Sequence, residues 1–438
     1  MIDVQQIKQK ERDAILQSLR AGVVPRIGIQ HIQVGRLNEI QSLLNDIDRI
    51  REGGSGARFI VGDYGSGKTF FIQVVRNMAL EKNMVTLAAD LNPQRRLNAS
   101  GGEARSLYTE LLKNASTRTK PDGGALSSIV EKFISSALVE SKQQGNSPEV
   151  VIRERLAKLM ELVNGFDFAT VITAYWKGHD TGNDQLKTDA IRWLRGEFTT
   201  KTDARLALGV RTIVDDANVY DMLKLLSLFV RLSGYSGLLV GLDEMVNLYK
   251  IGNSKSRTAN YEQILRYLND SLQGVSGGLL FLFAFTPESL MDTRKGLYSY
   301  EALQSRLSEN SFSQSMGVID YSSPVLRLAN LTPEDFYILL TRIRTVFTSG
   351  NANLMIPDEA IKQFMVHCSK RIGDAYFRTP RNTVRAFIDF LFILDQNPSL
   401  QWENLIGSVP IELETTVDVE PEIETPDLPE NELAAFKL

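Results

Sequence analysis

The sequence contains few of the residues that build disulfide frameworks and metal centres. Its 438 residues include one cysteine, Cys368, and three histidines. A single cysteine excludes a disulfide within the chain and a zinc site built on cysteines. The histidines are far apart and lack the spacing of metal ligands, so we expect ordinary surface or core positions for His31, His179 and His367.

Long apolar runs are also missing. The longest, Leu238–Leu242 and Gly277–Phe285, are far shorter than the ~20 residues that a helix needs to cross a bilayer. Between Met1 and Arg20, charged and amide side chains interrupt the apolar positions, so this segment has no apolar core of a secretory signal. With 43% apolar and 23% charged residues, the composition is that of an ordinary globular protein. We expect a soluble cytoplasmic protein that makes no membrane contact.

The sequence lacks the dense positive charge that often marks a dedicated DNA-binding protein. The net charge is −4, because residues 411–438 hold nine acidic side chains and one lysine. The remaining chain carries 48 basic and 44 acidic residues, a balance that neither requires nor excludes nucleic acid. Four prolines among the acids predict an extended or disordered tail over 410–438.

One glycine-rich stretch fits G-x-x-x-x-G-K-[ST], the pattern of the phosphate-binding loop. Its glycines let the backbone wrap round an anion, Lys68 supplies a charge for the β- and γ-phosphates, and the Thr69 hydroxyl can ligate Mg²⁺. An apolar strand at Arg58–Val61 precedes the loop and an apolar helix opens at Phe70, so bound phosphates would lie at a helix N-terminus. The predicted nucleotide-binding residues are Gly62, Asp63, Tyr64, Gly65, Ser66, Gly67, Lys68, Thr69 and Phe70.

An acidic pair follows the apolar strand Leu238–Leu242. Asp243 and Glu244 stand at the end of this strand, which is the Walker B pattern. We predict that Asp243 and Thr69 hold Mg²⁺ and that Glu244 is the general base that polarises the attacking water. The alternative is a strand that ends in two solvated acids.

Two further segments flank the predicted nucleotide. Thr286 ends the next apolar strand and could hydrogen-bond the attacking water or the γ-phosphate, the role called sensor 1. A compatible alternative is that Thr286 caps the turn that starts at Pro287. Gly35 and Arg36 stand before an amphipathic helix, where a close-approach glycine commonly lines the adenine pocket.

Two arginines further along the chain are candidates for stabilising the charge of the transferred phosphate. Arg306 lies in a helix after the sensor strand, from which it could reach the γ-phosphate of a neighbouring subunit. A plain surface arginine is the alternative. Arg381 opens an apolar helix and could fold a helical domain onto the nucleotide, the role called sensor 2, for which Arg378 and Arg385 compete.

The hydrophobic pattern divides the chain into successive segments. An N-terminal helix and linker precede the nucleotide-binding domain, a mostly helical insertion interrupts that domain, and a compact helical domain follows it. In residue numbers these are 1–33, 34–330 with the insertion at 95–230, 331–409, and the acidic tail at 410–438. Within the insertion, the aromatic-basic pieces at 175–177 and 193–195 could stack on bases, although packing between helices is their commoner use.

These motifs, taken in order, resemble those of the AAA+ superfamily: V-G-R-x-x-E, the phosphate-binding loop, Asp-Glu, a sensor threonine, S-R-L and T-P-R. The S-R-L and P-R elements are similar to its origin-recognition and Cdc6-like branch. More narrowly, G-D-Y-G-S-G-K-T-F-F, the lead-in from Val24 to Gly28 and T-P-R-N-T-V-R-A-F resemble the ATP-binding proteins of the BREX phage-defence system. The resemblance implies an α/β fold with an AAA+ P-loop NTPase core, a parallel sheet, a long helical insertion and a C-terminal helical lid domain.

The same resemblance implies what the protein does. It predicts an ATPase that uses ATP and Mg²⁺, forms a homo-oligomer when ATP is bound, and works with other proteins of a defence system. Its cycle would assemble or remodel a partner complex on DNA, which makes double-stranded DNA a candidate partner. The alternative is an ATP-gated signalling or assembly switch with slow turnover. A helicase ranks lowest, because no helicase motif accompanies the P-loop core.

Overall fold

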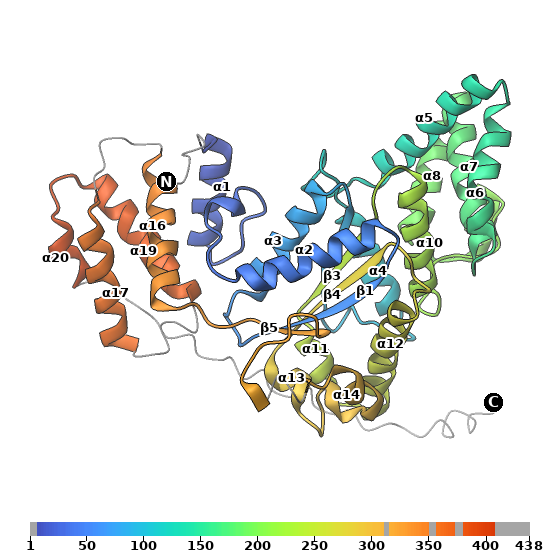
Figure 1. Cartoon of the computed structure of the whole chain (residues 1–438). Helices are drawn as coiled ribbons and strands as arrows, with labels where there is room; N and C mark the ends of the chain where they lie inside the picture. The colour runs from blue at the N-terminus through green and yellow to red at the C-terminus, as the bar shows by residue number, and fades with distance from the viewer. Residues whose placement is uncertain (1–6, 311–314, 350–355, 373–379, 408–438) are drawn as a thin grey trace, which may run out of the picture.

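A parallel sheet forms the centre of the molecule. The computed structural model describes residues 7–310, 315–349, 356–372 and 380–407. Within these residues, five parallel strands form one sheet in the order β2-β3-β4-β1-β5, which confirms the predicted α/β arrangement (Figure 1). The strands are β1 (Gly56–Val61), β2 (Val85–Asp90), β3 (Leu238–Asp243), β4 (Leu279–Phe285) and β5 (Val325–Arg327). The predicted acidic tail lies outside the described residues.

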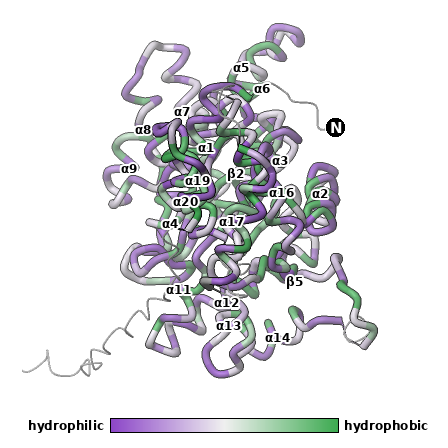
Figure 2. Tube along the Cα trace, turned by 90° about the vertical axis from the view of Figure 1, so that its left-hand side faces the viewer, coloured by the Kyte–Doolittle hydropathy of each residue, from purple (hydrophilic) through white to green (hydrophobic). Residues whose placement is uncertain are grey.

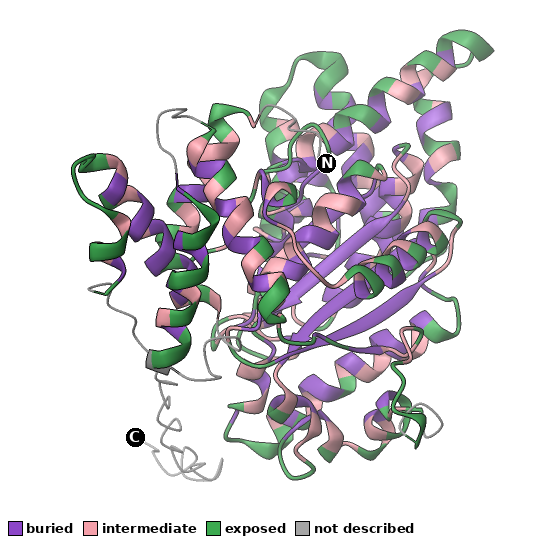
Figure 3. Cartoon of the chain, turned by 60° about the vertical axis from the view of Figure 1, so that its left-hand side comes forward, coloured by how far each residue is buried: buried purple, intermediate pink, exposed green. Residues whose placement is uncertain are grey.

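The central strands are buried because their side chains are apolar on both faces. Phe281 and Phe283 of β4 share one cluster with Phe59 and Tyr267, and the ring of Tyr267 stacks 4.9 Å from that of Phe281. Leu282, which lies between the two phenylalanines, belongs to a separate cluster. Figure 3 shows these strands buried along most of their length. Strands of this kind need helices on both faces of the sheet.

Helices supply that cover. α2 (Leu37–Arg51) and α3 (Lys68–Glu81) pack on the face of Leu282. α10 (Val219–Leu232) and α12 (Ser254–Leu272) pack on the face of the phenylalanines. Short helices follow the strands: α11 (Val246–Tyr249), α13 (Pro287–Met291) and α14 (Glu301–Leu307). Among the described residues, no helix combines the length and the apolar composition that crossing a membrane requires.

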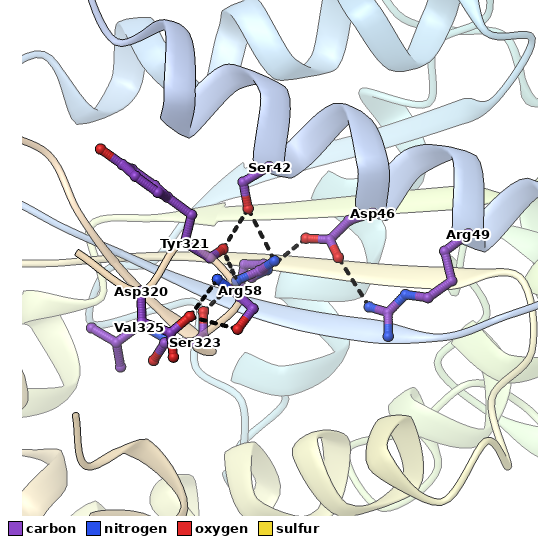
Figure 4. Close-up of polar contacts among 9 residues, drawn as sticks. Ser42, Asp46, Arg49, Arg58, Asp320, Tyr321, Ser323 and Val325 are labelled. Carbon is purple, nitrogen blue, oxygen red and sulfur yellow. Dashed lines mark hydrogen bonds and ion pairs between the residues drawn. The ribbon is translucent and has the colours of Figure 1, made fainter. Parts of the chain in front are cut away.

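A buried arginine joins α2 to the sheet (Figure 4). Arg58 of β1 donates from Nε to Asp46 of α2 at 2.5 Å and from Nη2 to the hydroxyl of Ser42 at 3.2 Å. Its Nη1 donates to the backbone carbonyls of Tyr321 and Ser323, just before β5. Because the charge is both paired and hydrogen-bonded, its burial is tolerated. Arg58 therefore holds α2 and the segment before β5 against β1.

A helical arm separates β2 from β3. It comprises α4 (Glu103–Lys113), α5 (Leu126–Gln144), α6 (Pro148–Met160), α7 (Gly165–Thr181), α8 (Asp184–Leu194) and α9 (Lys201–Leu208). In Figure 1, α5 to α8 project away from the helices at the other end of the molecule. Tyr175, Trp176 and Trp193 are buried in the arm, and Trp193 donates to the carbonyl of Thr212 at 2.8 Å. These aromatic rings pack between helices, so they present no open surface for bases.

The C-terminal helices form a second core. α16 (Pro333–Thr348), α17 (Asp358–Ile372), α19 (Pro380–Gln396) and α20 (Trp402–Ile406) pack together, and the N-terminal helix α1 (Gln9–Arg20) joins them. Arg20 of α1 pairs with Asp389 of α19 at 2.8 Å. In Figure 2, hydrophilic and hydrophobic positions alternate along the helices, as expected where one helix face is buried. The N-terminal helix is therefore part of the C-terminal helical unit, which we call the helical domain.

Candidate functional site

The glycine-rich loop connects β1 to α3, as its pattern predicts. Gly65 and Gly67 adopt positive φ angles of 76° and 87°, and Gly67 is the N-cap of α3. A Cβ atom on Gly62 would lie 2.5 Å from the hydroxyl of Ser66. Glycine is required at these positions, because a side chain would be strained at Gly65 and Gly67 and would collide at Gly62. The loop thus presents its backbone and the start of α3 to an anion.

Lys68 is held inside this loop. Its ammonium donates to the carbonyls of Gly62 at 2.8 Å and Asp63 at 2.9 Å. Burial lowers the pKa of Lys68, while the carboxylates of Asp243 and Glu244 act in the opposite direction. The ammonium therefore lies at the centre of the loop, where a phosphate group would be bound.

The P-loop threonine and the Walker B aspartate are directly bonded. Thr69 Oγ1 donates to Asp243 Oδ2 at 2.6 Å, although 174 residues separate them in sequence. Asp243 Oδ1 accepts the backbone N–H of Glu244 at 2.8 Å. Hydroxyl and carboxylate oxygens are ligands that Mg²⁺ accepts. The described residues contain no group of three or more His, Cys, Asp and Glu suited to a metal.

Glu244 stands at a sharp turn after β3. Its φ of 55° is left-handed, which is uncommon for a residue with a side chain. Partial removal from bulk water raises the pKa of Glu244, and the carboxylates of Asp243 and Asp90 raise it further. Asp90 ends β2 directly opposite Asp243, and its own pKa is raised by the same causes. This crowding of acids increases the affinity of Glu244 for a proton, which suits a general base.

Thr286 caps the helix that follows it, as the compatible alternative predicts, while its sensor-1 role stays a prediction. Its hydroxyl accepts the backbone N–H of Ser289 at 3.2 Å and caps α13. Thr286 also lines the same cavity as Lys68 and Glu244. The cap fixes the side chain at the end of β4, the strand between β1 and β3 in the sheet.

These groups share a cavity of about 930 Å³. Its polar end consists of the loop, Asp243, Glu244 and Thr286. Apolar side chains line the remainder, and they come from the segment around α1 and from the helical domain: Leu19, Val23, Val24, Ile32, Val34, Leu331, Leu339, Ile343 and Val384. A cavity with one anion-binding end and one apolar end matches the two chemical halves of a nucleotide.

Arg36 fixes the P-loop from outside. Its guanidinium donates to the carbonyl of Ser66 at 2.5 Å and to that of Ala329 at 3.3 Å. Burial lowers the pKa of Arg36, while the carboxylates of Glu39 and Asp335 counteract it. Arg36 lies on the cavity wall, whereas neighbouring Gly35 is not among the lining residues. A Cβ on Gly35, which has a φ of 62°, would lie about 3.1 Å from Asp335 of α16.

Arg381 of α19 reaches the cavity from the helical domain. It is one of the lining residues, and its guanidinium lies 5.8 Å from the ring centroid of Tyr64 in the P-loop. Arg385 is exposed one turn further along α19 and is not a lining residue. Arg378 lies outside the described residues. Of the two arginines that the structure describes here, Arg381 lines the cavity beside the P-loop and Arg385 does not.

Arg306 does not reach the cavity of its own chain. It is exposed on α14, where its guanidinium donates to the carbonyl of Ala302 at 2.8 Å. It is also not among the lining residues. Its action on the nucleotide of a neighbouring subunit stays a prediction.

The sequence reasoning missed Lys250. This lysine follows α11 and lines the cavity together with Val246. No motif singles it out, since it is one of many charged residues after a strand. Lys250 is six residues from Glu244 in sequence, and only the turn after β3 and the helix α11 place it at the cavity wall.

We compared the chain with known proteins and with models of protein families. No curated protein matches the chain. The family model of the BREX system ATP-binding protein BrxC/D matches residues 7–409. The match includes the P-loop, β3, the arm and the helical domain, so it covers both walls of the cavity. The chain therefore belongs to the family of BREX system ATP-binding proteins BrxC/D.

Proposed function

We propose that this protein is a Mg²⁺-dependent AAA+ ATPase. The observation that carries the proposal is the hydrogen bond between Thr69 and Asp243, with Glu244 beside it, at the polar end of the cavity. A P-loop alone is sufficient for binding a nucleotide. Hydrolysis also needs a metal site and a base, and Asp243 and Glu244 beside the loop are the candidates for these roles.

Each residue has a defined task in this reaction. The loop backbone and Lys68 would hold the β- and γ-phosphates. Thr69 and Asp243 would hold Mg²⁺, which would supply positive charge to neutralise the phosphate oxygens. Glu244 accepts a proton from water as the water oxygen bonds to the γ-phosphorus. The bond from that phosphorus to the bridging oxygen breaks, and ADP leaves with the bonding electrons. Thr286 and Arg381 position and neutralise the transferred group.

The wider role follows from the family. BREX membership supports a role in phage defence with other proteins of that system. In this proposal the protein is cytoplasmic, assembles as a homo-oligomer with ATP, and remodels or loads a partner complex on double-stranded DNA. Arg306 completes the site of the neighbouring subunit, as its exposure on α14 allows. The motifs that the chain shares with the origin-recognition and Cdc6-like branch are compatible with this role.

One feature favours a second function. The cavity is walled both by the sheet end and by the helical domain, so a nucleotide would contact both units. ATP would then gate assembly, and turnover would be slow.

Phosphate release by the full chain with ATP and Mg²⁺ tests the proposal. We expect turnover that depends on Mg²⁺ and rises with double-stranded DNA, whereas the switch predicts slow turnover that DNA leaves unchanged. If the chain binds no nucleotide, both functions are wrong. Light scattering with ATP measures the mass in solution. A monomer under all conditions, with Glu244→Gln included, would exclude the assigned role of Arg306.

A further inference from the structure

Lys250 occupies a defined position at the cavity wall. Val246 and Lys250 are four residues apart, so both side chains lie on the same side of the short helix α11. Both line the cavity that contains Lys68 and Glu244. The mechanism described above uses neither of them.

Polar contacts fix α11 on two sides. The side-chain amide of Asn247 donates to the carbonyl of Leu91, directly after β2, at 2.9 Å. The hydroxyl of Tyr249 donates to Glu288 at 3.1 Å and to Asp292 at 3.0 Å, next to α13. The helix that precedes Lys250 is thus anchored to the segments that follow β2 and β4.

The residues after Lys250 are anchored as well. Arg257 of α12 is buried, and its guanidinium donates to the carbonyl of Ile251 at 2.6 Å. Ile251 itself is buried. The backbone that carries Lys250 is therefore fixed on both sides, while its side chain extends from this support.

Lys250 lines the same cavity as the proposed base, Glu244. The positive charge of Lys250 lowers the pKa of Glu244, as that of Lys68 also does. In the described part of the chain, none of the hydrogen bonds or ion pairs engages the Lys250 side chain. A cation on a fixed support at the cavity wall can bind an anion placed in the cavity.

We propose that Lys250 binds the γ-phosphate of ATP and enables the site to distinguish ATP from ADP. The inference rests on the proposed function, because it takes the nucleotide phosphates to lie on the P-loop. Lys68 serves the β- and γ-phosphates from the loop side, and Lys250 serves the γ-phosphate from the side of Glu244.

Nucleotide affinities of the full chain test this inference. The probes are a non-hydrolysable ATP analogue and ADP, each with Mg²⁺. For Lys250→Ala we expect about tenfold weaker binding of the analogue, as for one lost charge-assisted hydrogen bond. Binding of ADP should change less than about twofold, because ADP has no γ-phosphate. Lys250→Arg should keep most of the affinity for the analogue.

Lys255→Ala is the matched control. Lys255 is exposed on α12 and lies outside the cavity, so its removal tests loss of charge alone. It should change neither affinity, and thermal unfolding should show that all variants are folded.

The possible outcomes separate this inference from the proposed function. If the wild-type chain binds neither nucleotide, the proposed function is wrong and the role of Lys250 is wrong with it. If the wild-type chain binds both, equal affinities of Lys250→Ala and wild type would overturn the role of Lys250 alone. An equal loss for ADP and the analogue would also overturn it, since the lysine would then act on the whole nucleotide.

Discussion

The end of the sheet and the helical arm are built by different means. At the sheet end, backbone strain and polar contacts dominate: Gly67 and Glu244 adopt positive φ angles, and Thr69 is bonded to Asp243. The arm is held by apolar packing, for example where the ring of Phe168 lies 6.3 Å from that of Trp193. Strain is retained where surrounding contacts hold it for a task. We therefore expect nucleotide chemistry to belong to the sheet end and to be independent of the arm.

The arm also differs from the sheet end in that large apolar side chains are exposed on its surface. Phe166 is 69% exposed and Leu206 is 82% exposed, although both are large and apolar. Phe166 lines a groove of about 370 Å³ between α6, α7, α8 and α9, and Arg153 and Lys177 stand among its lining residues. Exposed apolar side chains in such a groove favour contact with other molecules over catalysis.

Lys68→Ala should have the largest effect on the sheet end. The variant loses the ammonium at the centre of the loop, so ATP should bind about 100-fold more weakly or not detectably. Calorimetry with the full chain measures the affinity. The control is Lys82→Ala. Lys82 is a half-buried lysine just beyond the end of α3 that pairs with Asp48 outside the cavity, so this variant should bind ATP normally. Unchanged affinity in Lys68→Ala would falsify the P-loop assignment.

Glu244→Gln should separate binding from turnover. The amide keeps the size of the side chain but cannot take a proton from water, so turnover should fall about 10²- to 10⁴-fold while ATP still binds. Phosphate release and calorimetry measure the two effects. Glu262→Gln, on the exposed side of α12, is the control. Turnover close to that of the wild type would remove Glu244 from the role of base.

The pH dependence of turnover should also report on Glu244. A general base acts in its ionised form, and the pKa of Glu244 is raised above the ordinary 4.5. Turnover should therefore start to fall at a higher pH than for an ordinary glutamate, by about tenfold for each pH unit below the pKa. A profile of kcat against pH measures this acid limb. An acid limb at the pKa of an ordinary glutamate would contradict the crowding of Asp243, Asp90 and Glu244.

Arg381→Ala should have a moderate effect, because it tests the link from the helical domain to the nucleotide. We expect about tenfold weaker ATP binding from the loss of one charged contact. Arg385→Ala is a matched control, since Arg385 lies on the same helix outside the cavity. Equal effects of the two variants would mean that neither arginine is specific to the nucleotide.

Phe166→Ser on the arm should have the smallest effect. Phe166 is mostly exposed, so the variant should keep its stability within about 0.5 kcal/mol. Its ATP affinity and turnover should stay within about twofold of the wild type. Thermal unfolding and phosphate release check both. A loss of turnover would contradict the independence of the two regions and would connect the groove with the nucleotide site.

Motifs of contiguous residues were predicted well from the sequence. The strand, loop and helix around Lys68 and the strand that ends at Asp243 lie where the pattern places them. Apolar alternation and glycine content act over a few residues, so these elements do not depend on distant parts of the chain. The cap of α13 by Thr286 is predictable for the same reason.

Other features could not be predicted, because they depend on segments far apart in sequence. The packing of α1 against α19 and the place of Lys250 in the cavity carry no local signal. Arg58 looked like an ordinary first residue of a strand, yet it joins α2 to the segment before β5. Arg381 could not be separated from Arg378 and Arg385 by sequence, since one pattern contains all three.

The sequence by itself determined a glycine-rich loop at the start of a helix, two acids at the end of a parallel strand, and the expectation that Thr69 and Asp243 act together. Short-range backbone geometry decides the loop and the strand end. Tertiary structure alone decided which other groups join them: Arg36 bonds to Ser66, and Lys250 lines the cavity that contains Glu244. The physical reason is that a sequence pattern does not distinguish one lysine or arginine from another. Packing of the sheet, α11 and the helical domain determines which of these side chains reach the cavity.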